Sequence, residues 1–266
     1  MIIEQRIVEE DWDNLIILDA CRFDFFEKVY KDYLDGTLEK RISKGSNTGE
    51  WLVKTFPDKY DYVYISANPY INSRGIPLNK CRLEYKNYSW NAVEHFSKII
   101  DVWDFGWSKE IKTVHPRNVN IAYLSNIYKK KTIIHYMQPH YPYISYKKET
   151  FEVKGHKYLT KIMKKNYAIL RKNAPLITQK ITNLLRQPNT LKRICKKEGM
   201  EQLLYYYEEN LRIVLKHISR IINDLDGKTI ITADHGEAFG EQGIWQHPPE
   251  TYIPVLIEVP WLEVEG

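Results

Sequence analysis

Cysteines and long apolar runs are both scarce in this sequence. Its 266 residues include three cysteines, Cys21, Cys81 and Cys195, which are too few and too widely spaced for a disulfide framework or a C-x-x-C pair. No stretch approaches the ~20 apolar residues of a membrane helix. The first 13 residues are acidic and contain no apolar signal core. We therefore expect a soluble protein without an integral membrane segment, located in the reducing cytoplasm.

Charge is unevenly distributed along the chain. The formal net charge is +5, yet residues 147–197 contain 15 lysines and arginines against two acids. A basic block of this kind predicts an anionic partner, and a solvated helical face is an equally open explanation. Its helical pattern is broken by Pro175 and Pro188. We predict a basic helical insertion beside the functional site. We do not expect nucleic acid as the main partner, because no recognised nucleic-acid-binding motif is present.

Short apolar runs alternate with stretches of helical periodicity. The runs predict strands at residues 14–18, 60–66, 132–136, 229–232 and 253–259. The intervening patterns predict helices at residues 22–34, 91–100, 118–128 and 200–222. This alternation is typical of an α/β fold with a mostly parallel central sheet flanked by helices. We expect residues 1–266 to form one domain, with residues 147–197 as its insertion.

Acidic and imidazole side chains follow the predicted strands. Asp19 ends the first strand, His135 and His140 belong to the third strand and the loop after it, and Asp234-His235 follows the fourth, with His247 nearby. Ligands bind at the carboxyl ends of parallel strands, so we expect these groups to meet at one edge. Carboxylates with imidazoles are ligands that Zn²⁺ or Mn²⁺ prefers. Taken singly, Asp234 is explained as well by a capped turn, and His247 by a surface position.

A nucleophile is suggested by the small polar stretch SKGSNTGE at residues 43–50. Thr48 would lie at or near a helix start, where backbone N–H groups and the helix dipole favour an anion. A hydroxyl bound to a divalent ion loses its proton more readily and can attack phosphorus. The alternative is that Ser46, Asn47 or Thr48 serves only as the helix N-cap.

Four blocks of sequence together resemble the alkaline-phosphatase superfamily, above all its sulfatase-like branch. The last block is the most specific and is similar to the D-H-G-E-x-x-G-E-x-G…H run of phosphoethanolamine and related transferases. The blocks occur in the family's order: IILDACRFD (16–24), GSNTGEW (45–51), HYMQPHYPY (135–143) and TADHGEAFGEQGIWQH (232–247). The resemblance implies an alkaline-phosphatase-like fold over nearly the whole chain.

The resemblance also implies roles for individual residues. Asp19, Asp234 and His235 match the ligands of the main metal ion. Thr48 matches the threonine nucleophile of the transferases, which also contacts the metal. The implied cofactor is one divalent ion, Zn²⁺ or Mn²⁺, with a second ion as an alternative.

Two histidines match the remaining positions, and one cysteine does not match at all. His140, in the P-H-x-P loop, and His247 would bind a second ion or the transferring group, and would act in catalysis. A sulfatase would place formylglycine in C-x-P-x-R or S-x-P-x-R, whereas Cys21 is followed by Arg22-Phe23-Asp24. We expect Cys21 to be a buried residue at a helix start. Phosphate esters are therefore favoured over sulfate esters.

The resulting hypothesis is a metal-dependent hydrolase or transferase of phosphate esters with a threonine nucleophile. Its anionic ester substrate would be a glycan or a lipid-linked phosphate. The alternative is a catalytically inactive sulfatase-like protein that binds an anionic glycan or another polyanion. Metal content and turnover of a generic ester separate the two. The sequence indicates no particular oligomeric state.

Overall fold

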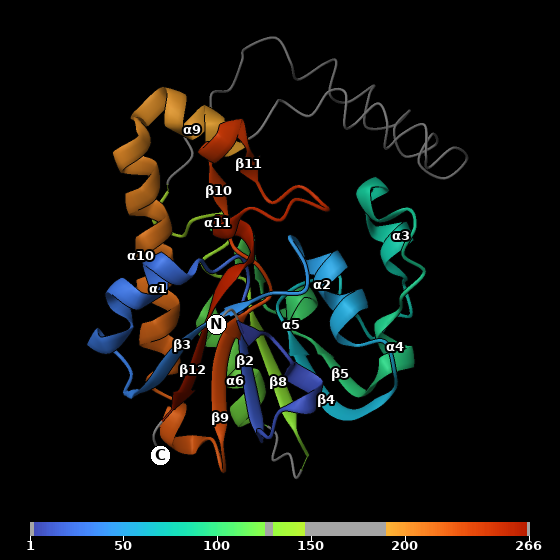
Figure 1. Cartoon of the computed structure of the whole chain (residues 1–266). Coiled ribbons are helices and arrows are strands. Elements are labelled where there is room, and N and C mark those ends of the chain that lie inside the picture. The colour runs from blue at the N-terminus through green and yellow to red at the C-terminus, as the bar shows by residue number, and fades with distance from the viewer. Residues whose placement is uncertain (1–2, 126–129, 147–189, 265–266) are drawn as a thin grey trace.

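A twisted central sheet runs through the molecule, with helices packed on both of its faces (Figure 1). The computed structural model describes residues 3–125, 130–146 and 190–264. The eight strands of the sheet lie in the order β1 (Ile3–Glu4), β3 (Gly36–Ile42), β12 (Glu258–Val264), β9 (Thr229–Ala233), β2 (Asn14–Leu18), β8 (Thr132–Tyr136), β4 (Tyr60–Ser66) and β5 (Phe96–Asp101). Within the described sheet, β12 alone runs antiparallel to its two neighbours.

The central strands are apolar because both of their faces are covered. Along β2, Leu15 and Ile17 belong to one buried cluster, and Ile16 and Leu18 belong to another. This alternation follows from the two-residue period of a strand. The continuous apolar runs of a parallel sheet thus explain why β2, β8 and β9 are recognisable in the sequence.

The helices form one layer on each face of the sheet. On one face, α1, α6 and α10 cover the cluster that contains Ile16 and Leu18, and on the other face α2 covers the cluster of Leu15 and Ile17. The helices are α1 (Phe23–Val29), α2 (Thr48–Thr55), α3 (Leu78–Cys81), α4 (Ala92–His95), α5 (Val102–Phe105), α6 (Pro116–Leu124), α9 (Thr190–Glu198), α10 (Met200–Ile218) and α11 (Pro254–Ile257).

Several shorter elements connect these layers. Two hairpins, each of two short strands, stand apart from the main sheet: β6 (Trp107–Ser108) with β7 (Thr113–Val114), and β10 (Ala238–Phe239) with β11 (Trp245–Gln246). Single 3-10 turns occur at Ile7–Glu9, Tyr30–Asp32, Leu83–Tyr85, Ile222–Asp224 and Glu241–Gly243. The β10–β11 hairpin leads directly into His247, one of the histidines expected at the site.

The predicted fold class is confirmed: the sheet is mostly parallel and is flanked by helices. Two element predictions are wrong. Residues 91–100 form the short helix α4 and then the edge strand β5, because pairing with β4 overrides the local helical pattern. Residues 253–257 begin with a helical turn that Pro254 can start, and the strand β12 follows it. Most of the predicted basic insertion, residues 147–189, lies outside the described residues.

Candidate active site

The carboxyl ends of β2 and β9 bring two aspartates together. Asp19 directly follows β2, Asp234 directly follows β9, and the two strands are paired. The Ala20 backbone N–H donates to Asp234 Oδ1 at 3.0 Å, which ties the two strand ends to each other. Both aspartates are buried. The sequence expectation that they share one edge of the sheet agrees with this geometry.

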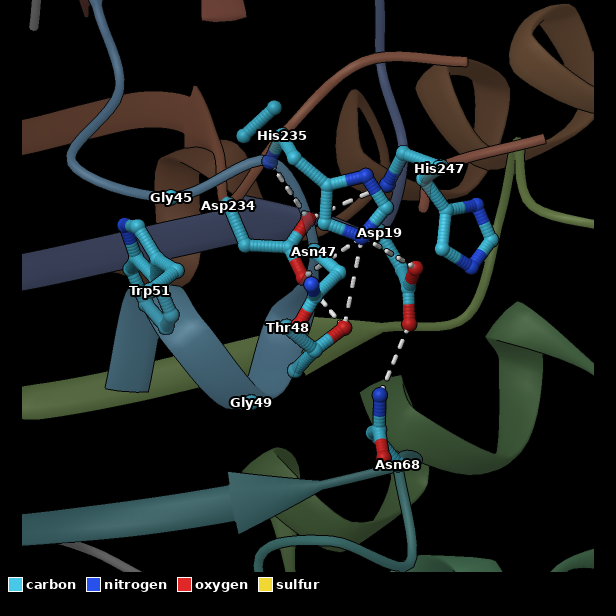
Figure 2. Close-up of polar contacts among 12 residues, drawn as sticks. Asp19, Gly45, Asn47, Thr48, Gly49, Trp51, Asn68, Asp234, His235 and His247 are labelled. Atoms are coloured by element: carbon cyan, nitrogen blue, oxygen red, sulfur yellow. Dashed lines mark hydrogen bonds and ion pairs between the residues drawn. The ribbon is translucent and has the colours of Figure 1, made fainter. Parts of the chain in front are cut away.

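Thr48 projects from the first residue of α2 toward these carboxylates (Figure 2). Its hydroxyl donates to Asp234 Oδ2 at 2.7 Å, and its Oγ1 lies 3.4 Å from His235 Nε2. The N-cap of α2 is Asn47, whose side-chain oxygen accepts from the Glu50 N–H at 3.0 Å. Because Asn47 caps the helix, the Thr48 hydroxyl is available to the site.

His235 completes what we call the carboxylate cluster: Asp19, Thr48, Asp234 and His235. Its Nε2 lies 3.7 Å from Asp19 Oδ1 and 3.5 Å from Asp234 Oδ2. Its Nδ1 lies 2.7 Å from the Gly236 carbonyl oxygen, which can only accept, so Nδ1 carries the proton. In the neutral ring, the lone pair of Nε2 therefore faces the two carboxylates. This is the tautomer in which histidine binds a metal ion.

The two buried carboxylates are electrostatically strained when no cation lies between them. Burial and the charge of Asp234 raise the pKa of Asp19 well above its ordinary value. The pKa of Asp234 is lowered, because His235, His135 and the Thr48 hydroxyl outweigh the effect of burial. Asp19 Oδ1 is buried without a hydrogen-bond partner. Two carboxylates, one free oxygen and an imidazole lone pair fit a divalent cation of the Zn²⁺ or Mn²⁺ type.

A second group, the imidazole cluster, consists of His140, Glu237 and His247. Their potential ligand atoms lie within 4.8 Å of one another. His247 Nδ1 is 3.0 Å from Glu237 Oε1, and the ring centroids of His140 and His247 are 5.0 Å apart. Burial raises the pKa of Glu237 to about 7 and lowers that of His140 to about 3. The cluster therefore combines neutral imidazoles with a carboxyl group that can hold a proton near neutral pH.

The two clusters adjoin each other, and both contribute to the lining of one pocket. The ring centroids of His235 and His247 are 4.6 Å apart. The pocket has a volume of about 180 Å³. Its lining includes polar groups of both clusters and an aromatic rim, namely Asp19, Thr48, Asn68, Arg82, His140, His247, Tyr70, Tyr85 and Trp107. The six residues to which the sequence resemblance assigns a role thus lie at one edge of the sheet.

His135 lies deeper than the other histidines. Its Nδ1 is 2.9 Å from the Tyr64 hydroxyl, and its Nε2 is 3.9 Å from Asp19 Oδ2. It is fully buried beneath the carboxylate cluster and does not line the cavity. Burial lowers its pKa to about 4, so the ring is neutral, and its Nε2 has no hydrogen-bond partner. With Asp19 and Asp234 it forms a group whose potential ligand atoms lie within 4.8 Å of one another, so His135 could also contact a metal ion.

Three side chains of the site were not predicted from the sequence. Asn68 donates its side-chain N–H to Asp19 Oδ2 at 2.8 Å, and it follows β4, so the rule of strand ends could have found it. Glu237 belongs to the last sequence block, but no role was given to it. Arg82 supplies a guanidinium at the cavity and comes from a short irregular segment, where no sequence pattern marks it.

Cys21 is buried immediately before α1, as expected. Burial, together with the charge of Asp24, raises the pKa of its thiol well above the ordinary value. The thiol therefore stays protonated, and a thiolate nucleophile at this position is disfavoured. This agrees with the absence of a formylglycine sequence context.

Comparisons with known proteins find similar structures but no similar sequences. No protein-family model matches the chain, and no curated protein matches it. Solved structures do match over 98% of this chain. One is the soluble domain of lipooligosaccharide phosphoethanolamine transferase A from Neisseria meningitidis, at 12% identity, 79% coverage of that domain and a TM-score of 0.51. Another is the C-terminal periplasmic domain of EptC from Escherichia coli in complex with zinc, at 12% identity, 75% coverage and a TM-score of 0.52. The chain spans about half, 49%, of the integral membrane form of the Neisseria enzyme.

These matches show that the chain has the alkaline-phosphatase-like α/β fold of the phosphoethanolamine transferase domains. They also show that the expected cytoplasmic location is wrong, because the EptC domain that shares this fold is periplasmic. The error has a physical reason: a few well-separated free thiols are compatible with an oxidising compartment as well as with a reducing one. Across the described residues, no helix combines the length and the apolar character needed to cross a membrane.

Proposed function

We propose that this protein is a metal-dependent phosphoric ester transferase or hydrolase with Thr48 as its nucleophile. The observation that carries the proposal is the Thr48 hydroxyl, which lies at the start of α2, is hydrogen-bonded to Asp234 and lines the cavity. In this proposal residues 1–266 act as one catalytic domain, with residues 147–197 as an insertion. The shared fold with phosphoethanolamine transferases supports it.

The carboxylate cluster would hold the main divalent ion, Zn²⁺ or Mn²⁺. His140 and His247 would hold a second ion or the transferring group, with Glu237 fixing the orientation of His247. A bound divalent ion lowers the pKa of a coordinated hydroxyl and withdraws charge from phosphoryl oxygens. The repulsion between Asp19 and Asp234 explains why the protein would bind such an ion tightly.

The side chains of the chain itself account for binding and proton movement. Arg82, at the cavity, would bind the non-bridging oxygens of the ester. Asp234 Oδ2 accepts the Thr48 proton as Oγ1 forms a bond to phosphorus and the bond to the leaving oxygen breaks. The leaving oxygen takes its proton from the Glu237–His247 pair, because the pKa of Glu237 is raised to about 7, whereas His140 is a neutral imidazole. Water or an acceptor hydroxyl then attacks phosphorus and gives its proton to the Glu237–His247 pair. The bond from phosphorus to Thr48 Oγ1 breaks, and Oγ1 takes its proton back from Asp234.

The test is a set of nitrophenyl esters assayed with Mn²⁺, Zn²⁺ and Mg²⁺. We expect turnover of p-nitrophenyl phosphate or of its diester, weaker turnover of p-nitrophenyl sulfate, and a phosphorylated peptide that contains Thr48. Thr48→Ala should lower the rate roughly 10³-fold or more, as the loss of a nucleophile does.

Thr55→Ala is the matched control, because this buried threonine lies on the same helix and its hydroxyl has no hydrogen-bond partner. It should retain most of the activity. Metal binding without turnover or adduct would instead support the inactive, polyanion-binding alternative. Equal activity in Thr48→Ala and in the wild-type chain would refute the threonine nucleophile.

A further inference from the structure

A second hollow lies beside the catalytic cavity, between α9 and the loop that follows His140. Its volume is about 500 Å³, so it is large enough for several sugar-sized units. The lining combines two tyrosines with a row of cations: Tyr141, Tyr146, Thr190, Arg193, Ile194, Lys196 and Lys197. The mechanism proposed above uses none of these side chains. We call this hollow the tyrosine–lysine groove.

The groove and the catalytic cavity share one loop as a wall. His140 and Pro142 line the cavity, whereas Tyr141, between them, lines the groove. The other wall of the groove, α9, packs against β11, and β11 is followed at once by His247. A molecule that lies in the groove therefore lies next to the imidazole cluster.

The cations of α9 point outward because its apolar residues point inward. Leu191 and Ile194 are buried, while Arg193 and Lys196 are exposed. Within the described part of the chain, neither of these two cations forms an ion pair, whereas Lys197 contacts Glu198 at 3.7 Å. Two unpaired cations on the wall of one groove favour a ligand that carries negative charge.

The tyrosines give the groove flat, partly exposed aromatic surfaces. Tyr141 packs edge-on against Tyr143, with ring centroids 5.5 Å apart, and Tyr146 packs against Tyr206 at 5.2 Å. These contacts hold the two rings from behind, and each ring keeps a half-buried surface in the groove. An aromatic ring with a polar tip suits the C–H face and the hydroxyls of a sugar.

We propose that the tyrosine–lysine groove is a binding subsite for an anionic saccharide, the part of the substrate that carries or accepts the ester. The tyrosines would contact sugar rings, and Arg193 and Lys196 would bind phosphate, sulfate or carboxylate groups on them. The assignment of this saccharide as the substrate rests on the proposed function. Binding in the groove is measurable by itself.

The first measurement is the affinity of Thr48→Ala for three probes: a sulfated hexasaccharide, its desulfated form and inorganic polyphosphate. We expect the sulfated hexasaccharide to bind best. Arg193→Ala/Lys196→Ala should weaken it roughly tenfold or more, because two charge-assisted contacts are lost. Tyr146→Ala should weaken the hexasaccharide and leave polyphosphate almost unchanged.

The matched control is Lys216→Ala/Arg220→Ala, which removes two exposed cations near the far end of α10. It should leave all three affinities unchanged. With Thr48 intact, Arg193→Ala/Lys196→Ala should turn over p-nitrophenyl esters at the wild-type rate. That arm keeps a failure of catalysis separate from a failure of binding.

Three outcomes would overturn the assignment. The first is an unchanged affinity of Arg193→Ala/Lys196→Ala for the sulfated hexasaccharide. The second is an equal loss of polyphosphate and hexasaccharide binding with no effect of Tyr146→Ala, which would mark a general polyanion surface. The third is equal weakening by the control pair, which would show that only net charge matters.

Discussion

The two clusters at the functional edge are built on opposite electrostatic principles. The carboxylate cluster places two aspartates against each other in the protein interior and leaves Asp19 Oδ1 without a partner. The imidazole cluster uses neutral rings and a carboxyl group whose pKa is raised to about 7. Each cluster leaves one buried polar atom without a partner, Asp19 Oδ1 in the first and His140 Nδ1 in the second, but only the first sets two carboxylates against each other. Two neighbouring clusters of acidic and histidine side chains can therefore differ in how strongly they need a bound cation to offset buried negative charge.

The largest effect should come from removing the charge that the carboxylate cluster shares with Thr48. Asp234→Asn loses both a proposed metal ligand and the charged acceptor of the Thr48 hydroxyl, so the rate should fall roughly 10³-fold or more. Calorimetric titration of Zn²⁺ or Mn²⁺ should show affinity lower by about 100-fold or more. Asp224→Asn, at an exposed acid, is the control and should change neither value. Metal binding of wild-type strength in Asp234→Asn would remove the basis of the comparison.

A smaller effect on rate, with metal binding retained, should follow from damage to the imidazole cluster. His247→Gln breaks the contact with Glu237 and should lower the rate about 10²–10⁴-fold, the range of a lost general acid. The main ion should still bind with nearly wild-type affinity. His95→Gln, on α4, is the matched control for the loss of an imidazole. If His247→Gln also abolishes binding of the main ion, the two clusters form one unit and do not divide the work.

The stability of the metal-free chain should reveal the repulsion between the two aspartates of the carboxylate cluster. Asp19→Asn removes one of two repelling charges, and an asparagine oxygen can still accept from Asn68. Without metal, the variant should be more stable than the wild-type chain by about 1–4 kcal/mol, the size of one charge pair at short range. With Zn²⁺ or Mn²⁺ added, the order should reverse. Chemical unfolding with and without metal measures both, and a metal-free variant less stable than wild type contradicts the prediction.

Glu50 is a buried carboxylate whose pKa is lowered, in contrast to that of Asp19, which is raised. It accepts from the Ser46 N–H and hydroxyl, both at 3.0 Å, from Lys54 at 2.6 Å and from the Tyr252 hydroxyl. Burial alone would raise its pKa, but the hydrogen bonds from Lys54, Ser46 and Tyr252 outweigh burial and lower it below 4.5. Glu50→Gln should therefore destabilise the chain, by about 1.5–3 kcal/mol at pH 7.

The pH dependence of this last effect has a definite sign. A lowered pKa in the folded state means that the stabilisation is present above the unfolded value and is lost as the pH falls through the folded value. The difference between wild type and Glu50→Gln should shrink as the pH drops below about 4.5, the ordinary value for glutamate. Urea unfolding at several pH values measures it. A difference that grows in acid would show that the carboxylate is not held in its ionised form.

The residues of the carboxylate cluster could be found from the sequence because they follow central strands. The apolar runs that end at Leu18 and near Ala233 are continuous, since both faces of these strands are buried, and the next residues are Asp19 and Asp234. Thr48 could be found through the helix that it begins. For these positions, local patterns and tertiary position agree.

Other features depend on partners that no local pattern reveals. Strand β3, GTLEKRI, has the polar alternation of a partly exposed strand, and only its pairing with β12 fixes it in the sheet. Arg82 reaches the cavity from an irregular segment after α3, where side-chain direction is set by tertiary contacts. The local pattern at residues 91–100 predicts a helix, but β5 forms over the second half of this range because it pairs with the neighbouring strand β4.

The position of β12 governs the order in which the molecule can be assembled during synthesis. In the described sheet, β1 and β3 are joined to the remaining strands only through β12, and β3 leads into the loop that carries Thr48. Strands β2 and β9 pair directly, so Asp19 and Asp234 can meet before β12 leaves the ribosome. The loop that carries Thr48 is fixed in two stages: α2 packs on β2 through Trp51 and Leu52, whereas β3 enters the sheet only through its late, long-range pairing with β12. A growing chain can thus bring Asp19 and Asp234 together and pack α2 first, and it fixes the strand that leads to Thr48 last.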